Sequence, residues 1–300
     1  MVLEDLPRTS AWLPNVSVIV PTYNRPQMMT EALHSILTQT YKNFEIVVVN
    51  DGGADVERML TAFGRQRPLT YIRHATNRGL AAARNTGLKV ARGKYIAYLD
   101  DDDVFFPTHL ETLVQFLEKS EFKIAYTDAY RAHQTKTNEN YIVTKRDIPH
   151  SYDFDEDLIL IHNLAPVLCF MHERSCIEKV GNFDETLTTH EDWDLWIRMS
   201  RCFKMAHIKR VTCEYRWRED GSTMSSSMPH DFLRTSGLLY DRYRSYSGMP
   251  RIIRWFPEGA VAGALRFFTY YRLCSNRHGY FRAVHRVLEV WRMEHETPRT

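Results

Sequence analysis

The sequence predicts an α/β domain built on a doubly wound, mostly parallel sheet. Three observations support this class. Short apolar runs alternate with helical patterns along the first 130 residues. Several of these runs are apolar enough to be buried on both faces, which is typical of parallel strands. Polar or acidic residues follow the strands directly, where parallel strands end at one edge of a sheet.

The first expected strand is the β-branched run Val16–Val20, which the prolines of Pro21–Pro26 end. The helix after it is indicated by the spacing of Met29, Leu33 and Ile36. The same reasoning, applied along the chain, gives further strands at Phe44–Val49, Thr70–Arg73 and Tyr95–Leu99, and helices at Val56–Phe63 and Leu80–Val90. Strands joined by helices in this way imply right-handed crossovers.

The second half of the chain is less regular. Residues 131–165 are polar and predict a loop-rich insertion over the site. Tyr215–Ser227 contains a glycine and several serines, and predicts a mobile loop. The regular elements expected here are strands at Ile124–Thr127, Val167–Met171 and Phe203–Val211, and helices at Cys176–Val180 and from Glu191.

The domain organisation that we expect has three parts. Residues 1–14 form a lead-in, and residues 15–230 form the α/β domain, which has two halves at 15–130 and 131–230. Residues 231–300 form a helical C-terminal extension that is rich in arginine and aromatic residues. Such helices can lie on an anionic membrane surface, pack back on the domain, or pair with a second subunit in a homo-oligomer.

Composition limits the possible functions. The net charge of +2 gives no electrostatic case for nucleic acid as a partner. The five cysteines lack metal-type spacing and are typical of reduced thiols in a cytoplasmic protein. The N-terminus does not resemble a signal peptide, and no apolar run is long enough for a transmembrane helix. We therefore expect a cytoplasmic protein, with the inner face of the membrane as a further possible location.

Four consecutive carboxylates, Asp100–Asp103, follow the strand at Tyr95–Leu99. Like charges on adjacent residues repel, and the usual resolution is a bound cation. Hard oxygen ligands suit Mg²⁺ or Mn²⁺, often shared with the phosphates of a substrate. The alternative is a solvated acidic turn in which Asp103 caps the next helix. Neither a glycine-rich dinucleotide motif nor a Walker loop follows the first strand, which argues against an NAD-binding site.

Seven segments in order resemble a family 2 glycosyltransferase of the GT-A fold, over roughly residues 15–225. These segments are Val16–Arg25, Val48–Gly53, Asn77–Gly87, Tyr98–Asp103, Lys179–Glu185, His190–Arg198 and Tyr215–Ser222. The resemblance implies an inverting, metal-dependent enzyme that transfers a sugar from a nucleoside diphosphate sugar, with UDP as the expected nucleotide. The cofactor it implies is Mn²⁺ or Mg²⁺. It also implies that residues 15–130 form the nucleotide-sugar half of the domain and residues 131–230 the acceptor half.

The resemblance also implies roles for individual residues. Asp102 would bind the metal, Asp100 or Asp101 would face the ribose and sugar, and Asp51 would accept a hydrogen bond from a pyrimidine base. Asp192 would be the general base. The other residues assigned to the nucleotide-sugar are Pro21, Tyr23, Arg25, Asn77, Gly79 and Arg84, with Arg78 as an alternative to Arg84; those assigned to the acceptor or diphosphate are Glu191, Trp193, Arg216 and Arg218.

Each of these residues could instead have a purely structural role. Asp51 could form an Asp–Gly turn, and Arg84 could be a solvated or sheet-packing arginine. Glu191 and Asp192 also suit a helix N-terminus electrostatically. Trp193 could simply pack in the core, and Asp194 is a lesser candidate for the base.

The sequence departs from the family pattern near its end. Family members often carry a histidine in this stretch, whereas here Arg216 and Arg218 occupy it. Arginine binds a diphosphate well as a bidentate donor but cannot ligate a metal. The departure suggests that arginine compensates part of the charge.

The function that we expect is transfer of a sugar to a hydroxyl of a glycan or lipid-linked acceptor in cell-surface polysaccharide synthesis. One alternative is a nucleotidyltransferase on the same fold. It would favour a basic, glycine-rich loop after the first strand, which Pro21–Asn24 does not supply. The other is a non-catalytic module that binds nucleotide-sugars or carbohydrates.

Overall fold

The structure is a computed structural model that describes residues 13–138, 140–160, 162–220, 222–223, 229–243 and 245–246. The described chain divides into two compact units. The first unit contains the residues up to Phe154 and those from Asn163 to Thr223. The second contains residues 155–160, His162 and the residues from Pro229 onward.

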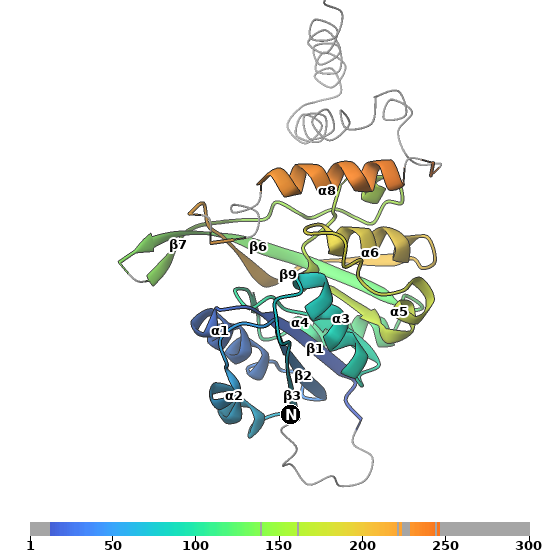
Figure 1. The fold of residues 1–300 in the computed structure, drawn as a ribbon. Helices are drawn as coiled ribbons and strands as arrows, with labels where there is room; N and C mark the ends of the chain where they lie inside the picture. The colour runs from blue at the N-terminus through green and yellow to red at the C-terminus, as the bar shows by residue number, and fades with distance from the viewer. Residues whose placement is uncertain are drawn as a thin grey trace, which may run out of the picture. The chain divides into compact units, whose positions relative to one another are not determined.

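A nine-stranded sheet runs through the described part of the first unit (Figure 1). Its first half is parallel, in the order β3 (Leu69–Arg73), β2 (Phe44–Asn50), β1 (Val16–Thr22) and β4 (Tyr95–Tyr98). Every residue of β1 and β2 is buried, as expected for central parallel strands covered on both faces. The predicted α/β class is therefore confirmed.

The second half of the sheet mixes strand directions. The strands, in sheet order, are β8 (Phe170–Glu173), β6 (Ile124–Thr137), β9 (Met205–Trp217) and β5 (Val104–Phe105), with β7 (Asn140–Asp147) paired to β6 off this path. β8 runs antiparallel to β4 and β6, whereas β6 and β9 are parallel. The end of β9 thus lies next to the acidic residues that follow β4.

The helices of the first unit are α1 (Pro26–Leu37), α2 (Glu57–Gly64), α3 (Leu80–Val90), α4 (His109–Glu118), α5 (Arg174–Val180) and α6 (Glu191–Ser200), with the short 3₁₀ helix η2 (Val167–Cys169). α3 packs on β1 and β2 (Figure 1). α1 contacts β5. α6 begins after His190, whose backbone is left-handed at φ 59°, and its first turn carries three acids that favour a helix N-terminus.

The structure corrects three expectations for the second half of the chain. Residues 131–137 and 140–147 belong to an antiparallel ribbon of β6 and β7 rather than to a loop-rich insertion. The ribbon was missed because solvent reaches much of both faces, so its sequence lacks apolar alternation. Residues 167–169 form η2 instead of the start of a strand. β9 extends to Trp217, so Tyr215–Trp217 is strand and not loop.

The second unit contains a 3₁₀ helix, η1 (Leu158–Leu160), and the helix α8 (Pro229–Arg242). The start of the predicted helical extension is therefore helical. The arginine- and aromatic-rich stretch from residue 247 onward lies outside the described residues, and the proposed membrane or subunit contact falls there. Among the residues that are described, no helix is long and apolar enough to cross a membrane.

Gly93 lies where the backbone before β4 passes close to β1. Its N–H donates to Ser17 Oγ at 2.8 Å. A Cβ atom added to Gly93 would lie 2.5 Å from Ser17 N and 2.7 Å from Val16 C, so backbone would have to move. By contrast, a Cβ on Gly64, at the end of α2, would meet only Leu69 Cβ at 3.9 Å.

We expect Gly93→Ala to lower the free energy of unfolding by about 1–3 kcal/mol, because an overpacked site forces the backbone apart. The matched control Gly64→Ala should leave it unchanged or raise it by up to about 1 kcal/mol. Urea denaturation measures both. An unchanged midpoint for Gly93→Ala would contradict the close approach of these strands.

Candidate functional site

Polar residues that follow β1, β2 and β4 meet at the carboxyl edge of the parallel half-sheet. Strand register places the end of β1 beside the end of β2, with Thr22 opposite Asn50. The Thr22 hydroxyl donates to Asp101 Oδ2 at 2.8 Å, which joins the end of β1 to the acidic turn after β4. The predicted convergence of strand ends is thus present, at the place where open α/β sheets bind ligands.

Asp51 organises the loop that precedes α3. Its Oδ1 accepts the N–H of Arg78 at 2.9 Å and lies 2.7 Å from His74 Nδ1. Its Oδ2 accepts the N–H of Gly79 at 2.7 Å, and Gly79 has a positive φ of 93° that suits glycine. Asp51 is therefore more than an Asp–Gly turn. Each carboxylate oxygen has two lone pairs, so Oδ2 keeps capacity for one further donor.

Asp101 is committed to protein partners. In addition to Thr22, it accepts the N–H of Tyr23 at 3.3 Å and pairs with Arg25 at 3.3 Å. Burial, and then the charge of Asp102, raise the pKa of Asp101 to about 7. Asp100 is more open, with 27% of its side chain exposed. Of the two candidates for the ribose and sugar, the geometry favours Asp100.

Asp102 lies between two arginines. Its Oδ2 pairs with Arg25 Nη1 at 3.2 Å and accepts a hydrogen bond from Arg218 Nη2. Burial raises the pKa of Asp102, and the two guanidinium groups oppose that rise. Arg218 comes from the end of β9 and is itself buried, with Nη1 3.3 Å from Gln134 Oε1. One of the two arginines that distinguish this stretch, Arg218, therefore contacts the carboxylate expected to bind metal.

Asp103 does not cap a helix, which corrects the sequence-based alternative. β5 follows it directly, and α4 begins at His109 after Thr108. Asp103 instead accepts the backbone N–H of Arg216 at 3.0 Å, which ties β9 to the acidic turn. The Arg216 side chain pairs with Glu31 on α1.

Arg84 joins the two halves of the first unit. Its guanidinium donates to both oxygens of Asp100, at 2.7 and 3.0 Å, and to Glu191 at the start of α6. Arg84 is 1% exposed, so it is not a solvated arginine. Burial raises the pKa of Glu191 to about 7. The charge of Arg84 opposes this rise, and the charge of Asp192 adds to it. The buried guanidinium of Arg84 therefore binds one carboxylate from each half of the unit.

Asp192 is partly exposed beside this pair. Its Oδ1 accepts the N–H of Trp193 at 2.7 Å and its Oδ2 accepts Asn163 Nδ2 at 3.2 Å. Burial raises the pKa of Asp192 above its ordinary value. Trp193 is 3% exposed, which favours the packing role over stacking on a sugar. Asp194 is fully buried against Arg198 Nε at 2.8 Å, which is a structural contact.

The remaining predicted residues lie at the same edge of the sheet. Pro21 is a buried residue of β1, whereas Tyr23 is 46% exposed directly after it. Asn77 is exposed, and its Oδ1 accepts the N–H of Gly79 at 3.2 Å. These residues surround the Asp51 loop, as a nucleotide-binding role would require.

Sequence reasoning missed several residues that position this site. Thr22 is part of the first motif but carries no chemical signal of its own. His74 follows a strand end directly, as Asp51 does, and that position could have indicated it. Asn163 lies in a polar segment without periodicity, and no signal in the sequence singled it out.

Whether these residues suit a divalent cation depends on what the substrate supplies. Among the described residues, no three His, Cys, Asp or Glu side chains gather as a metal cluster. A Mg²⁺ or Mn²⁺ ion shared with substrate phosphates needs only one or two carboxylates from the protein. Here six carboxyl groups, Asp100–Asp103, Glu191 and Asp192, are offset by four guanidinium groups, those of Arg25, Arg84, Arg216 and Arg218. This excess of acid fits a cation at Asp102.

The sequence of the chain is similar to those of known proteins. The sequence model of the family described as glycosyl transferase family 2 matches residues 17–179. An uncharacterized glycosyltransferase of Rickettsia prowazekii is 36% identical over 199 residues, which are 65% of this chain and 61% of that protein. The uncharacterized glycosyltransferase YwdF of Bacillus subtilis is 30% identical over 217 residues, 71% of this chain and 78% of its own.

Two solved structures share the fold. TarS of S. aureus in complex with UDP-GlcNAc has a TM-score of 0.64 and 21% identity, over 90% of this chain and 79% of its own. The mannosyltransferase PcManGT of Pyrobaculum calidifontis, in complex with GDP-Man and Mn²⁺, has a TM-score of 0.59 and 16% identity, over 94% and 81% of the two chains. At these identities the likeness establishes the fold alone.

The raised pKa of Glu191 predicts that the difference in stability between wild type and Glu191→Gln depends on pH. In the folded state this pKa is about 7, above the ordinary 4.5, so the stability that protonation provides is lost as pH rises through 7. Arg84, Asp192 and Asp100 are the charged groups that act on it. Glu191→Gln stays neutral, so we expect its free energy of unfolding relative to wild type to increase from pH 5 to pH 8.

Urea denaturation at pH 5, 6, 7 and 8 measures this difference. Glu178→Gln on the exposed side of α5 is the matched control and should show a constant difference from wild type. A Glu191→Gln difference that is constant or decreases with pH would contradict the raised pKa.

Proposed function

The chain belongs to glycosyl transferase family 2, a family of sugar-transferring enzymes, and we propose that it is an inverting transferase acting on a nucleoside diphosphate sugar. One observation carries the proposal. Arg84 binds Asp100, from the half expected to hold the donor, and Glu191, which precedes the candidate base Asp192. The donor carboxylates and the base are thereby fixed beside one another, as transfer in a single displacement requires.

The proposed donor is a UDP-sugar. Asp51 Oδ2 has capacity for one further hydrogen bond, and the imide N–H of uracil is a suitable donor. Tyr23 is exposed nearby, where it can lie against the base together with Pro21. Asp100, the more open acid, would accept hydroxyls of the ribose or sugar. The neighbouring structures bind UDP-GlcNAc in one case and GDP-Man in the other, so GDP is the second nucleotide to test.

The leaving diphosphate would be neutralised by a divalent cation on Asp102 and by arginine. The cation supplies charge stabilisation of the leaving group. Arg218 and Arg25 already lie at Asp102, and the buried Nε groups of Arg216 and Arg218 have no hydrogen-bond acceptor among the described residues. Buried donors without acceptors are costly, and diphosphate oxygens would satisfy them.

Asp192 would remove the proton from the acceptor hydroxyl as it attacks the anomeric carbon. An inverting displacement needs this base on the face opposite the leaving diphosphate. Burial raises the pKa of Asp192 toward neutral pH, where a general base works best. The N–H of Trp193 and the amide of Asn163 orient its carboxylate. An α-linked donor would give a β-linked product.

The acceptor that we propose is a hydroxyl of a glycan or of a lipid-linked glycan, in cell-surface polysaccharide synthesis at the cytoplasmic side of the membrane. A nucleotidyltransferase is less well supported, because Pro21–Asn24 forms the end of β1 and the two residues after it, where that chemistry would favour a basic, glycine-rich loop. The matched part of the chain covers 61% of the length of the R. prowazekii relative. It covers 29% of the length of an uncharacterized glycosyltransferase of Rickettsia bellii, to which it is 31% identical.

We expect Asp192→Asn to reduce donor turnover by about 10²–10⁴-fold while nucleotide binding remains. Release of UDP or GDP from a panel of nucleotide-sugars, with water or glycans as acceptor, measures turnover. Isothermal titration with the nucleoside diphosphate measures binding. The amide keeps the size of the side chain and one acceptor oxygen, for the N–H of Trp193, but cannot take up a proton.

The matched control is Glu178→Gln, the removal of an exposed acid on α5. It should turn over the donor at the wild-type rate. Wild-type rates in Asp192→Asn would exclude Asp192 as the base. A wild-type protein that binds nucleotide but turns over no donor would instead support the non-catalytic binding module.

A further inference from the structure

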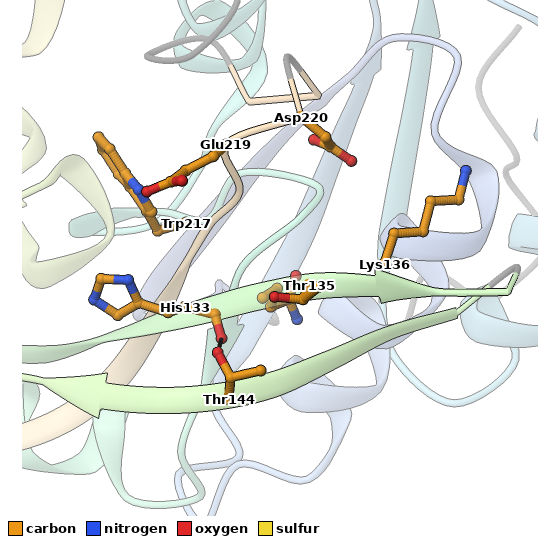
Figure 2. Close-up of a pocket in the computed structure, with 8 residues that line it drawn as sticks. His133, Thr135, Lys136, Thr144, Trp217, Glu219 and Asp220 are labelled. Carbon is orange, nitrogen blue, oxygen red and sulfur yellow. Dashed lines mark hydrogen bonds between the residues drawn. The ribbon is translucent and has the colours of Figure 1, made fainter.

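A groove of about 350 Å³ lies outside the donor site, between the β6–β7 ribbon and the end of β9 (Figure 2). Its volume is at the lower end of small-molecule sites, which run from about 300 to 1,000 Å³. The walls carry His133, Thr135 and Lys136 from β6 and Trp217, Glu219 and Asp220 from the end of β9 and the residues that follow. None of these residues has a role in the donor chemistry described above.

Trp217 gives the groove an aromatic surface held in a fixed position. It lies opposite His133 in the register of β6 and β9. The Arg131 guanidinium is 5.8 Å from the centre of its ring and also forms two hydrogen bonds with Asp147, at 2.9 and 2.6 Å. Asp220 is fixed as well, because it accepts the Tyr141 hydroxyl at 2.7 Å. The groove is therefore built before any ligand arrives.

The charges and polar groups of the groove define the ligand class. Lys136 is offset by Glu219 and Asp220, so the lining has a small negative balance that disfavours phosphate. Hydroxyl, imidazole, carboxylate and ammonium groups together offer both donors and acceptors. An aromatic face beside mixed donors and acceptors matches a neutral sugar, whose C–H face is apolar and whose rim carries hydroxyls.

The groove is connected to the reacting centre through one arginine. Gln134 is part of its lining and accepts a hydrogen bond from Arg218 Nη1 at 3.3 Å. Nη2 of the same guanidinium donates to Asp102. We propose that the groove binds a neutral sugar unit of the acceptor, away from the sugar whose hydroxyl reacts. This inference rests on the proposed transferase function.

The test uses saturation-transfer NMR with methyl glycosides of glucose, galactose, mannose and N-acetylglucosamine as probes. We expect at least one to bind the wild-type chain, with about tenfold weaker binding to Trp217→Ala and a smaller loss in Trp217→Phe. Thr135→Trp places a large side chain in the groove at an exposed position and should also abolish binding. The matched control Thr137→Trp, two residues along the same strand and outside the groove, should bind as wild type does.

Nucleoside diphosphate affinity and donor cleavage in water are measured on the same variants, and both should stay within twofold of wild type. Equal sugar binding by wild type, Trp217→Ala and Thr135→Trp would overturn the inference. So would the absence of sugar binding in a wild-type protein that cleaves donor. Failure of wild type to cleave any donor would contradict the proposed function instead, which keeps the two results separate.

Discussion

The buried ion pairs of Arg84 are the interaction on which the rest of the site depends. Removing one partner of a buried pair costs about 3–5 kcal/mol, because it leaves the other charge uncompensated. Arg84 has two such partners, Asp100 after β4 and Glu191 at the start of α6. The position of α6, and with it Asp192, is therefore coupled to the acidic turn, although some 90 residues separate them in the sequence.

Excess negative charge is the second constraint at this edge of the sheet. Asp101, Asp102 and Asp103 are almost completely buried, and burial raises the pKa of each. A diphosphate would add further negative charge to the same place. Arg25 and Arg218 offset part of it, and a divalent cation would offset more. Arg218 would therefore supplement the proposed cation, and it connects Asp102 with Gln134 in the groove beside Trp217.

The parallel half of the fold and its acidic edge could be predicted from sequence because the patterns that indicate them lie within short segments of the chain. Apolar runs such as Phe44–Val49 end in a turn, and parallel strands bring those turns together. The β6–β7 ribbon could not be predicted, since solvent reaches much of both its faces and its sequence therefore does not alternate apolar and polar residues. The partners of Arg84 and of Asp103 come from segments distant in the sequence, so only the folded chain shows that Asp103 binds the backbone of Arg216 rather than capping a helix.

The measurement that tests the account most directly is thermal stability in the presence of UDP, GDP, CDP or dTDP, each with and without Mn²⁺, for wild type and Asp102→Asn. A ligand at a hundred times its Kd stabilises the folded state by about 2.7 kcal/mol. The account predicts a Mn²⁺-dependent increase in melting temperature with one nucleotide, strongest with UDP, that is lost in Asp102→Asn. No increase with any nucleotide, or an equal Mn²⁺-dependent increase in the variant, would contradict a cation-assisted donor site at Asp102.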